Sequence, residues 1–307
     1  MIYNTKNSAQ ENFHIPVMVK EVIAYLLPNQ ELAQNNNKEP MYIDATIGGG
    51  GHTQAVLENI SKGIVVGLDC DIDAVEFTKN RLKQYSNLFL YHTSYTNIDK
   101  IANEYPHHYV QGVLFDLGVS AFQITTPTRG FTYHAEGPLD MRFNQILPSK
   151  IAKEIIHDTS LNDLRKIFFE YGEERYSNKI AARVFLKRNE INTTIQLAEV
   201  IREVTPPNKL NKTLSRIFQS LRIVVNHELE NIKAGLETAI NLLTTGARIV
   251  VISYHSLEDR IIKQAFRHFA EMEILKILTK KPLRPELTEI VSNSSARSAR
   301  LRAAERI

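Results

Sequence analysis

The sequence predicts an α/β fold of the Rossmann-like kind, interrupted by an all-helical insertion. Apolar strands alternate with amphipathic helices over roughly the first 120 residues, a pattern typical of a parallel sheet covered by helices on both faces. The periodicity is then helical from residue 151 to about residue 225, and strand and helix alternate again beyond residue 228. We therefore predict a first α/β part at 1–125, a helical insertion at 126–225 and a second α/β part at 226–307.

The first βαβ unit indicates a nucleotide-like cofactor. A buried strand at 41–43 is followed by four consecutive glycines, Gly48 to Gly51, and by a helix that is under way at Gln54. Glycine amides can approach a ligand closely, and the N-terminus of the next helix attracts negative charge. A second apolar strand at 63–69 ends on Asp69, about 20 residues further on, where an acid can bind ribose hydroxyls.

Asp44, at the end of the first strand, bears on which cofactor this is. A dehydrogenase fingerprint reads Gly-x-Gly-x-x-Gly and holds a pyrophosphate, which a neighbouring carboxylate would repel. Residues 44–53 instead read Asp-Ala-Thr-Ile-Gly-Gly-Gly-Gly-His-Thr. An acid here suits a cationic or amino-acid group, so we favour S-adenosylmethionine over NAD. A purely structural glycine turn remains the alternative.

The remaining elements extend the same sheet. Strands are predicted at 86–92 and at 112–116, and residues 124–148 read as a loop. After the insertion come a helix at 228–243, a strand at 247–253 and a helix beyond Leu257. Ligands of open α/β sheets bind outside the carboxyl ends of the strands, so we expect one crevice to be faced by Asp44, Gly48 to His52, Asp69, Tyr95 and Asp116.

The composition is that of an ordinary globular enzyme. The chain has 307 residues, 43% of them hydrophobic and 23% charged, and no apolar run reaches membrane-spanning length. Cys70 is the single cysteine, which excludes an internal disulfide framework and a cysteine metal cluster, and we expect no metal. Residues 1–12 are polar and lack the apolar core of a signal sequence, so we predict a flexible tail on a cytoplasmic protein.

The charge distribution points to a nucleic-acid partner. The net charge is only +3, but residues 150–220 contain 13 Lys and Arg against nine Asp and Glu, and residues 276–307 contain eight against three. Aromatic residues are interleaved with these charges, as at 165–169 and 183–188, a combination that fits RNA or DNA binding. Solvated faces of amphipathic helices are an equally good interpretation of any single segment.

Short motifs spread over nearly the whole chain resemble the bacterial RsmH (MraW) family of ribosomal RNA small-subunit methyltransferases. Several of them together are highly specific. They are His14–Met18 with Glu21 and Val22, Asp44–Thr46, Gly48 with Gly50–Thr53, Asp116–Ser120 with Gln123, Arg129–Phe131, Gly137–Arg142, Tyr171–Arg175, Phe218–Ile223 and His255–Arg260. The chain departs from the family pattern at Ala45, at Glu136 and at 293–297, which puts the path of the C-terminal tail in doubt.

The resemblance implies methyl transfer from S-adenosylmethionine to the exocyclic N4 amine of a cytidine in the decoding centre (P-site) of 16S ribosomal RNA, leaving S-adenosylhomocysteine. It implies a class I methyltransferase domain whose helical insertion recognises the RNA within the small ribosomal subunit. A homodimer is compatible with it. By the same resemblance, Gly50, Gly51 and His52 would hold the methionine end of the cofactor, and Asp69 would hold its ribose. Tyr95 would contact the adenosine side, and Asp116 and Gln123 would lie beside the methyl group.

The chemistry adds candidate catalytic residues. Methyl transfer from a sulfonium is an in-line displacement that depends mainly on positioning, and Asp116 is our candidate for the acceptor that orients the amine. His255 is a second candidate base, although Ser256 and Glu258 behind it favour a helix-capping role. The arginines suited to contact RNA phosphates are Arg129, Arg142, Arg297, Arg300 and Arg302. The aromatic rings suited to stack on an unstacked base are those of Phe131, Tyr133 and Phe143.

Two other functions remain open. A DNA amino-methyltransferase grips its base with an Asn/Asp/Ser-Pro-Pro-aromatic tetrad at the tip of the fourth strand, whereas residues 116–119 here read Asp-Leu-Gly-Val. The pair Pro206-Pro207 lies in the helical insertion and is followed by Asn208, so it does not supply that tetrad. A non-catalytic assembly factor that holds the cofactor without turnover is the second alternative.

Overall fold

The structure, a computed structural model, describes residues 16–27 and 38–307, so the predicted tail at 1–12 lies outside the described residues. The chain divides into two compact units. One, the helical unit, is Val119–Glu228, and the other, the α/β unit, consists of the described residues of Phe13–Gly118 together with Leu229–Ile307. The helical unit is therefore inserted between two sequence segments of the α/β unit.

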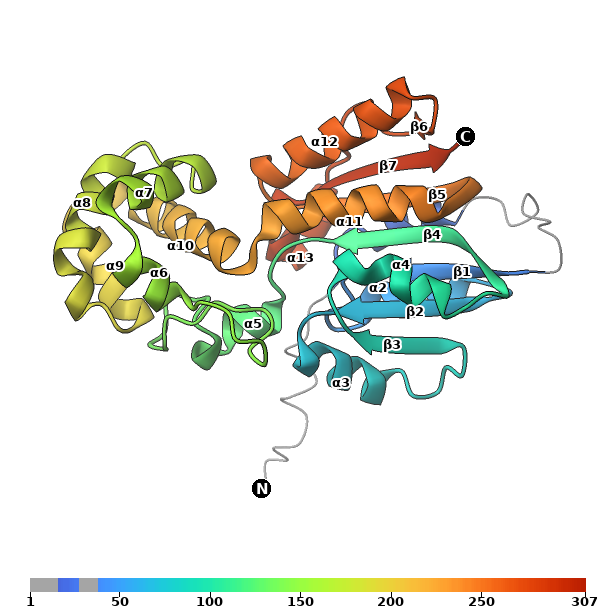
Figure 1. Ribbon diagram of the computed structural model, residues 1–307, viewed down its shortest axis with the longest axis horizontal. Helices are drawn as coiled ribbons and strands as arrows, with labels where there is room; N and C mark the ends of the chain where they lie inside the picture. The colour runs from blue at the N-terminus through green and yellow to red at the C-terminus, as the bar shows by residue number, and fades with distance from the viewer. Residues whose placement is uncertain (1–15, 28–37) are drawn as a thin grey trace. The chain divides into compact units, whose positions relative to one another are not determined.

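A single mixed sheet organises the α/β unit (Figure 1). The strands that are described follow the order β3-β2-β1-β4-β5-β7-β6. The first five in that order run parallel to one another, while β7 is antiparallel to both β5 and β6. The strands are β1 (Glu39–Asp44), β2 (Ile64–Asp69), β3 (Leu88–His92), β4 (His108–Asp116), β5 (Leu243–Ser253), β6 (Leu275–Ile277) and β7 (Arg300–Arg306).

Alternate strand residues build two apolar cores, one on each face of the sheet. Ile43 and Phe115 belong to the core that contains residues of α4, α11 and α12, whereas Tyr42 and Leu114 belong to the core that contains residues of α1 and α2. Helices therefore cover both faces, as predicted for this class of sheet. The helices of this unit are α1 (Val19–Leu26), α2 (Gly51–Asn59), α3 (Ile72–Arg81), α4 (Ile98–Asn103), α11 (Glu228–Leu242), α12 (Ser256–Glu271) and α13 (Leu287–Ser292).

The helical unit has an apolar core of its own. Phe168, Leu197 and Leu221 are fully buried in it, and the predicted loop before it contributes Phe131 and Met141 to the same cluster. Capping side chains set several helix starts, since they accept bonds from first-turn amides that have no intrahelical partner. The helices are α5 (Ala121–Thr125), α6 (Ala152–Asp158), α7 (Leu161–Lys166), α8 (Ser177–Lys187), α9 (Thr194–Arg202) and α10 (Leu210–Asn226), with a π-helical segment Ile167–Tyr171 after α7.

The α/β Rossmann-like prediction with a helical insertion is confirmed, and the predicted strands of the first 120 residues agree with β1 to β4. The sequence interpretation missed β7, which it treated as a basic tail. This strand pairs with β5 along its length, from Arg248 opposite Glu305 to Ser253 opposite Arg300. Its charges are matched locally, because Arg302 lies 2.7 Å from Asp259 and Arg248 lies 3.0 Å from Glu305.

None of the described helices combines the length and the apolar character needed to cross a lipid bilayer.

Candidate active site

The candidate site lies where the parallel strands β1, β2 and β4 end. Their last residues are Asp44, Asp69 and Asp116, so the structure brings the three predicted acids to the same edge of the sheet. The chain moves from β1 outward to β3 and then returns to β4 on the other side of β1. The strand order therefore reverses between β1 and β4, the position at which α/β sheets open a ligand crevice.

The glycines between β1 and α2 serve different purposes. Gly48 has a φ of 46°, and a Cβ built there would meet no atom within 4 Å, so open space lies beside it. A Cβ on Gly50, whose φ is 72°, would approach Thr78 to 2.7 Å, and one on Gly51 would approach Pro16 to the same distance. Close packing thus requires glycine at 50 and 51, whereas Gly48 borders space that a ligand can occupy.

Helix α3 holds this glycine loop from behind. Thr78 donates a hydrogen bond from its hydroxyl to the Gly48 carbonyl at 3.0 Å, and the Arg81 guanidinium donates to the Gly49 carbonyl. The α3 helix is itself fixed at its start, where Asp71 accepts from the amide of Asp73. The sequence interpretation named neither Thr78 nor Arg81, because nothing in their local pattern separates them from ordinary helix residues.

The start of α2 is suited to an anion. Its N-cap residue is Gly50, which makes no side-chain capping bond, and the first amides of an α-helix have no intrahelical acceptor. The positive end of the helix dipole adds to their attraction for negative charge. A carboxylate or phosphate at this point would bind the amides directly.

Asp69 ties the glycine loop to the end of β2. Its carboxylate accepts from the amide of Gly48 at 3.0 Å and from the amide of Asp71 at 2.9 Å. Burial raises the pKa of Asp69 to about 6, against the opposing effect of these two bonds. The predicted ribose-binding acid is therefore fixed in orientation next to the open space beside Gly48.

Asp44 is buried under the loop rather than exposed beside it. Only 2% of the residue is accessible, and its carboxylate accepts from the Thr53 hydroxyl at 2.6 Å and from the Thr46 amide at 3.2 Å. Burial raises the pKa of Asp44, and the nearby Asp116 carboxylate contributes to the rise. Asp44 therefore ties the end of β1 to Thr46 and to Thr53 in the first turn of α2.

Asp116 is held from three directions. The Tyr254 hydroxyl donates to Oδ1 of Asp116 at 2.8 Å, and the Asp116 amide donates to the Thr46 hydroxyl at 2.7 Å. Nδ1 of His52 lies 3.5 Å from Oδ2 of Asp116. The sequence interpretation did not name Tyr254, although it follows β5 directly and so reaches the same edge of the sheet.

His52 links the glycine loop to the segment before α1. Its Nε2 lies 2.8 Å from the carbonyl oxygen of Val17 and must be the donor, because a carbonyl oxygen can only accept. Nδ1 then faces the Asp116 carboxylate. Of the motif residues before α1, Val17 and Pro16 therefore contact His52 and Gly51, while His14 and Ile15 lie outside the described residues.

The structure gives His255 a capping role. It is the N-cap residue of α12, where its Nδ1 accepts from the Glu258 amide at 3.4 Å and its Nε2 lies 3.1 Å from the Glu258 carboxylate. Glu258 is fully buried, and its other oxygen accepts from the amides of Tyr254 and His255. Nδ1 of His255 is thus engaged with its own helix, whereas its buried Nε2 makes no hydrogen bond within the described part of the chain. The assignment of His255 as a second candidate base stays a prediction.

Two further predicted cofactor residues also make structural contacts. The Tyr95 ring packs edge-on against Phe115, with centroids 5.5 Å apart, and a Cβ on Gly235 of α11 would reach 2.6 Å from it. In the helical unit, the side-chain oxygen of Gln123 accepts from the Ser120 amide at 3.0 Å and so completes the capping box of α5. Their assignment to the cofactor stays a prediction.

The predicted RNA-binding arginines differ in how available they are. Arg129 is only 3% exposed and donates to the carbonyls of Arg142 and Phe143, so it holds the loop together instead of facing solvent. Arg142 makes two bonds of 2.9 Å to Asp140. At the C-terminus, Arg300 and Arg302 pair with Asp259 at 3.7 and 2.7 Å, whereas Arg297 is exposed.

The predicted stacking aromatics lie in the core of the helical unit. Phe131 and Phe143 stack on each other with centroids 5.6 Å apart, and Tyr133 packs edge-on against Phe218 at 5.2 Å. All three predicted residues belong to or pack against the same apolar cluster. Packing within the helical unit therefore accounts for these aromatic residues without a role in stacking on an RNA base.

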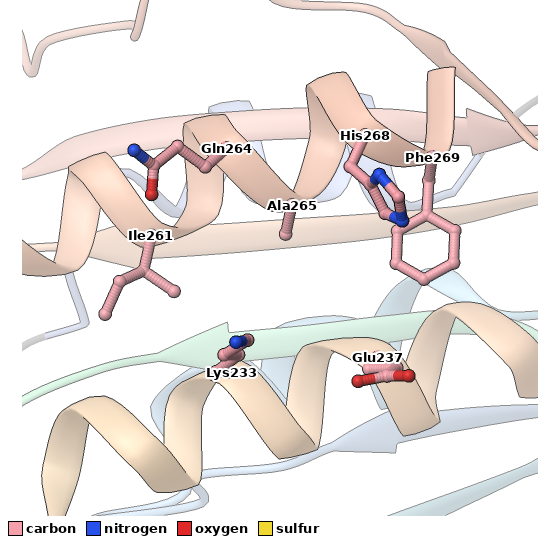
Figure 2. Close-up of a pocket in the computed structure, with 7 residues that line it drawn as sticks. All are labelled: Lys233, Glu237, Ile261, Gln264, Ala265, His268 and Phe269. Carbon is pink, nitrogen blue, oxygen red and sulfur yellow. The ribbon is translucent and has the colours of Figure 1, made fainter. Parts of the chain in front are cut away.

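A groove of about 440 Å³ lies between α11 and α12 (Figure 2). Residues from the flanks of the two helices line it, and none of these residues follows a parallel strand, so the groove is separate from the candidate site. The lining residues are Lys233, Glu237, Ile261, Gln264, Ala265, His268 and Phe269.

Comparison with known proteins places this geometry in a family. The family model described as the MraW methylase family matches residues 11–307. A ribosomal RNA small subunit methyltransferase H from Pseudothermotoga lettingae is 40% identical over 304 residues, which cover 96% of this chain and 99% of that relative. A protein of the same name from Thermotoga neapolitana is 42% identical over 302 residues, covering 96% of each chain.

Among solved structures, an rRNA methylase from Streptococcus thermophilus gives a TM-score of 0.39 at 11% identity, covering 88% of this chain and 89% of that one. That likeness is too distant to support an argument. The family match, in contrast, spans nearly the whole chain and confirms the resemblance drawn from the short motifs. The chain belongs to the MraW methylase family.

Proposed function

We propose that the protein transfers a methyl group from S-adenosylmethionine to the exocyclic N4 amine of a decoding-centre (P-site) cytidine in 16S ribosomal RNA. The observation that carries this proposal is the fixed Asp116 carboxylate at the tip of β4, next to an open, uncapped glycine loop. The names of the relatives support ribosomal RNA of the small subunit as the substrate. That substrate implies a cytoplasmic protein.

The residues present fit S-adenosylmethionine. The uncapped start of α2 suits the carboxylate of its methionine end, and the open space beside Gly48 admits a ligand close to the backbone. Asp69, next to that space, suits the ribose hydroxyls. The three strand-end acids favour a ligand that carries an ammonium and a sulfonium, whereas they would repel the pyrophosphate of NAD.

When bound, S-adenosylmethionine supplies an electrophilic methyl group, so the protein's own contribution is mainly positioning. The cytidine N4 lone pair is delocalised into the ring, and the amine must therefore be held by its hydrogens. A carboxylate oxygen carries two lone pairs and can accept more than one hydrogen bond, so Asp116 can accept from the amine as well as from Tyr254. Asp116 is our candidate for the group that orients the amine.

The RNA must present an accessible base. An N4 amine inside a stacked pair cannot meet the methyl group, so the target is single-stranded or flipped out. We assign phosphate contacts to the exposed Arg297 and recognition of the surrounding RNA to the helical unit. Arg142 and Arg300 retain 18% and 23% of their side-chain exposure and can add to the phosphate contacts.

The test is methyl transfer from labelled S-adenosylmethionine to unmodified small ribosomal subunits, naked 16S RNA and duplex DNA in parallel, with the product nucleoside identified. Label on cytidine N4 in subunits or in 16S RNA is the expected result. Label on DNA would instead establish a DNA amino-methyltransferase. Cofactor binding without any transfer would establish a non-catalytic factor.

An Asp116→Ala variant tests the assigned residue in the same assay. Loss of the orienting acceptor should reduce the rate by roughly 100-fold or more, while Glu271→Ala should transfer at the wild-type rate. Glu271 is an exposed acid at the last residue of α12, at the opposite end of that helix from the site. Full activity of Asp116→Ala would remove Asp116 from the mechanism.

A further inference from the structure

The turn between β5 and α12 delivers a phenol to the Asp116 carboxylate. Tyr254 follows the last residue of β5, and its hydroxyl lies 2.8 Å from Oδ1 of Asp116. The ring is partly buried and packs with the apolar core that contains residues of α1 and α2. A carboxylate oxygen can only accept, so the phenol is the donor in this bond.

The backbone around Tyr254 is held as firmly as the side chain. The buried carboxylate of Glu258 accepts from the Tyr254 amide at 2.8 Å and from the next amide at 3.2 Å. His255 closes the same turn as the N-cap of α12. The motif at 255–258 therefore acts on the site indirectly, since it fixes the turn from which Tyr254 reaches Asp116.

We propose that Tyr254 is a positioning residue for methyl transfer: its hydroxyl fixes Oδ1 of Asp116 and keeps this carboxylate ionised and oriented toward the acceptor amine. The proposal rests on the function proposed above, in which Asp116 orients that amine. Tyr254 itself contacts Asp116 and not the reacting atoms. Its effect therefore operates through the orientation and charge of Asp116.

Two titratable groups lie near the Asp116 carboxylate and influence its ionisation. His52 faces Asp116 from α2 at 3.5 Å, and the buried Asp44 carboxylate at the end of β1 is close enough to interact with it electrostatically. Asp44 opposes ionisation of Asp116, whereas a donor hydrogen bond favours it. Burial raises the pKa of the Tyr254 phenol well above its usual range, and the Asp116 carboxylate adds to the rise, so the donor hydrogen stays in place at any working pH.

The test is Tyr254→Phe, which keeps the ring and removes only the hydroxyl. A hydrogen bond to a charged group has a strength that corresponds to a fall in kcat of roughly 10- to 100-fold, with the KM for S-adenosylmethionine nearly unchanged. The acid limb of the pH–rate profile should move to higher pH by about one unit. Tyr105→Phe is the matched control, because it also removes a phenol hydroxyl that takes part in a hydrogen bond. Its partner is Tyr91 on β3, which is separated from β1 by β2.

A double-mutant cycle separates positioning from a general structural effect. If Tyr254 acts through Asp116, then Tyr254→Phe should have little further effect on kcat in an Asp116→Asn background. An equal loss in both backgrounds, or an unmoved acid limb in Tyr254→Phe, would overturn the proposal.

A second readout does not depend on turnover. In the ¹³C-carboxyl titration of the protein without cofactor, assigned with Asp116→Asn, the midpoint for Asp116 should move to higher pH in Tyr254→Phe. An unmoved midpoint would refute the role of Tyr254. If the wild type transferred no methyl group to any RNA, the proposed function would fail, while this titration would still decide whether Tyr254 controls the charge of Asp116.

Discussion

Gly48→Ala tests whether the open space beside the glycine loop holds the cofactor. Gly48 has a φ of 46° with no atom within 4 Å of a built Cβ, and Gly246, at the start of β5, has a φ of 79° with equally open surroundings. Both glycines thus have a positive φ, but only Gly48 lies at the candidate site, so Gly246→Ala is the matched control.

Each variant has a calculable cost without ligand. A Cβ in the left-handed region destabilises the fold by about 1–2 kcal/mol, and neither variant adds a steric clash. We therefore expect similar decreases in the free energy of unfolding for the two proteins. By contrast, Gly51→Ala adds a contact of 2.7 Å with Pro16 and should be less stable than either.

Cofactor binding should separate the pair. If the ligand fills the space beside Gly48, an added methyl group overpacks the complex by about 1–3 kcal/mol, which corresponds to a roughly 5- to 150-fold weaker Kd for S-adenosylmethionine. Gly246→Ala should bind like the wild type in the same titration calorimetry. Equal affinities for Gly48→Ala and Gly246→Ala would refute the assignment of this space to the cofactor.

Three other variants test the acids and the RNA surface. Burial raises the pKa of Asp69 in the folded protein to about 6, so the protonated carboxyl stabilises the fold at low pH and this stabilisation is lost as the pH rises. Between about pH 4 and pH 6, the free energy of unfolding of the wild type, measured with urea, should therefore fall by up to about 3 kcal/mol relative to that of Asp69→Asn. Thr53→Val removes the hydroxyl that donates to buried Asp44 and should cost about 1–3 kcal/mol, whereas Thr53→Ser should restore most of it; equal stability of all three would contradict the role of this bond. Arg297→Glu should weaken RNA binding and lower the slope of log affinity against log salt by about one or more, while Arg129→Gln should chiefly lower Tm, and the reverse pattern would exchange their roles.

The sequence predicted those features that depend on local pattern. The strand at 41–43, the glycine loop and the strand ending at Asp69 agree with β1, the start of α2 and β2. Since parallel strands end at a common edge, the meeting of Asp44, Asp69 and Asp116 could be predicted as well. None of these inferences required knowledge of a contact between distant segments.

What the sequence could not show depends on such contacts. Tyr254 lies 138 residues from Asp116, and Thr78 lies 30 residues from the Gly48 carbonyl that it binds. Strand β7 escaped prediction for another reason, since Arg-Leu-Arg-Ala-Ala-Glu-Arg has few residues of high strand propensity. Its strand conformation is stabilised by pairing with β5 and by partners such as Asp259, which no local pattern reveals.

The three strand-end acids are each stabilised by a different kind of donor. Hydroxyl and amide groups bind Asp44, backbone amides bind Asp69, and a phenol binds Asp116. None of these donors is a lysine or an arginine, and the basic side chain of His52 lies 3.5 Å from Asp116. Mutual repulsion among the acids persists, and it contributes to the raised pKa values of Asp44 and Asp69.

A cationic ligand relieves that repulsion, and a neutral ligand of the same shape relieves it less. S-adenosylmethionine carries a sulfonium that S-adenosylhomocysteine lacks, so in the proposed site the acids would favour the substrate form of the cofactor over its product. A proton on Asp116 would instead remove the charge with which the proposed mechanism holds the amine. In the proposed mechanism the donor at Tyr254 therefore serves the transfer step, because it keeps ionised the carboxylate that orients the amine.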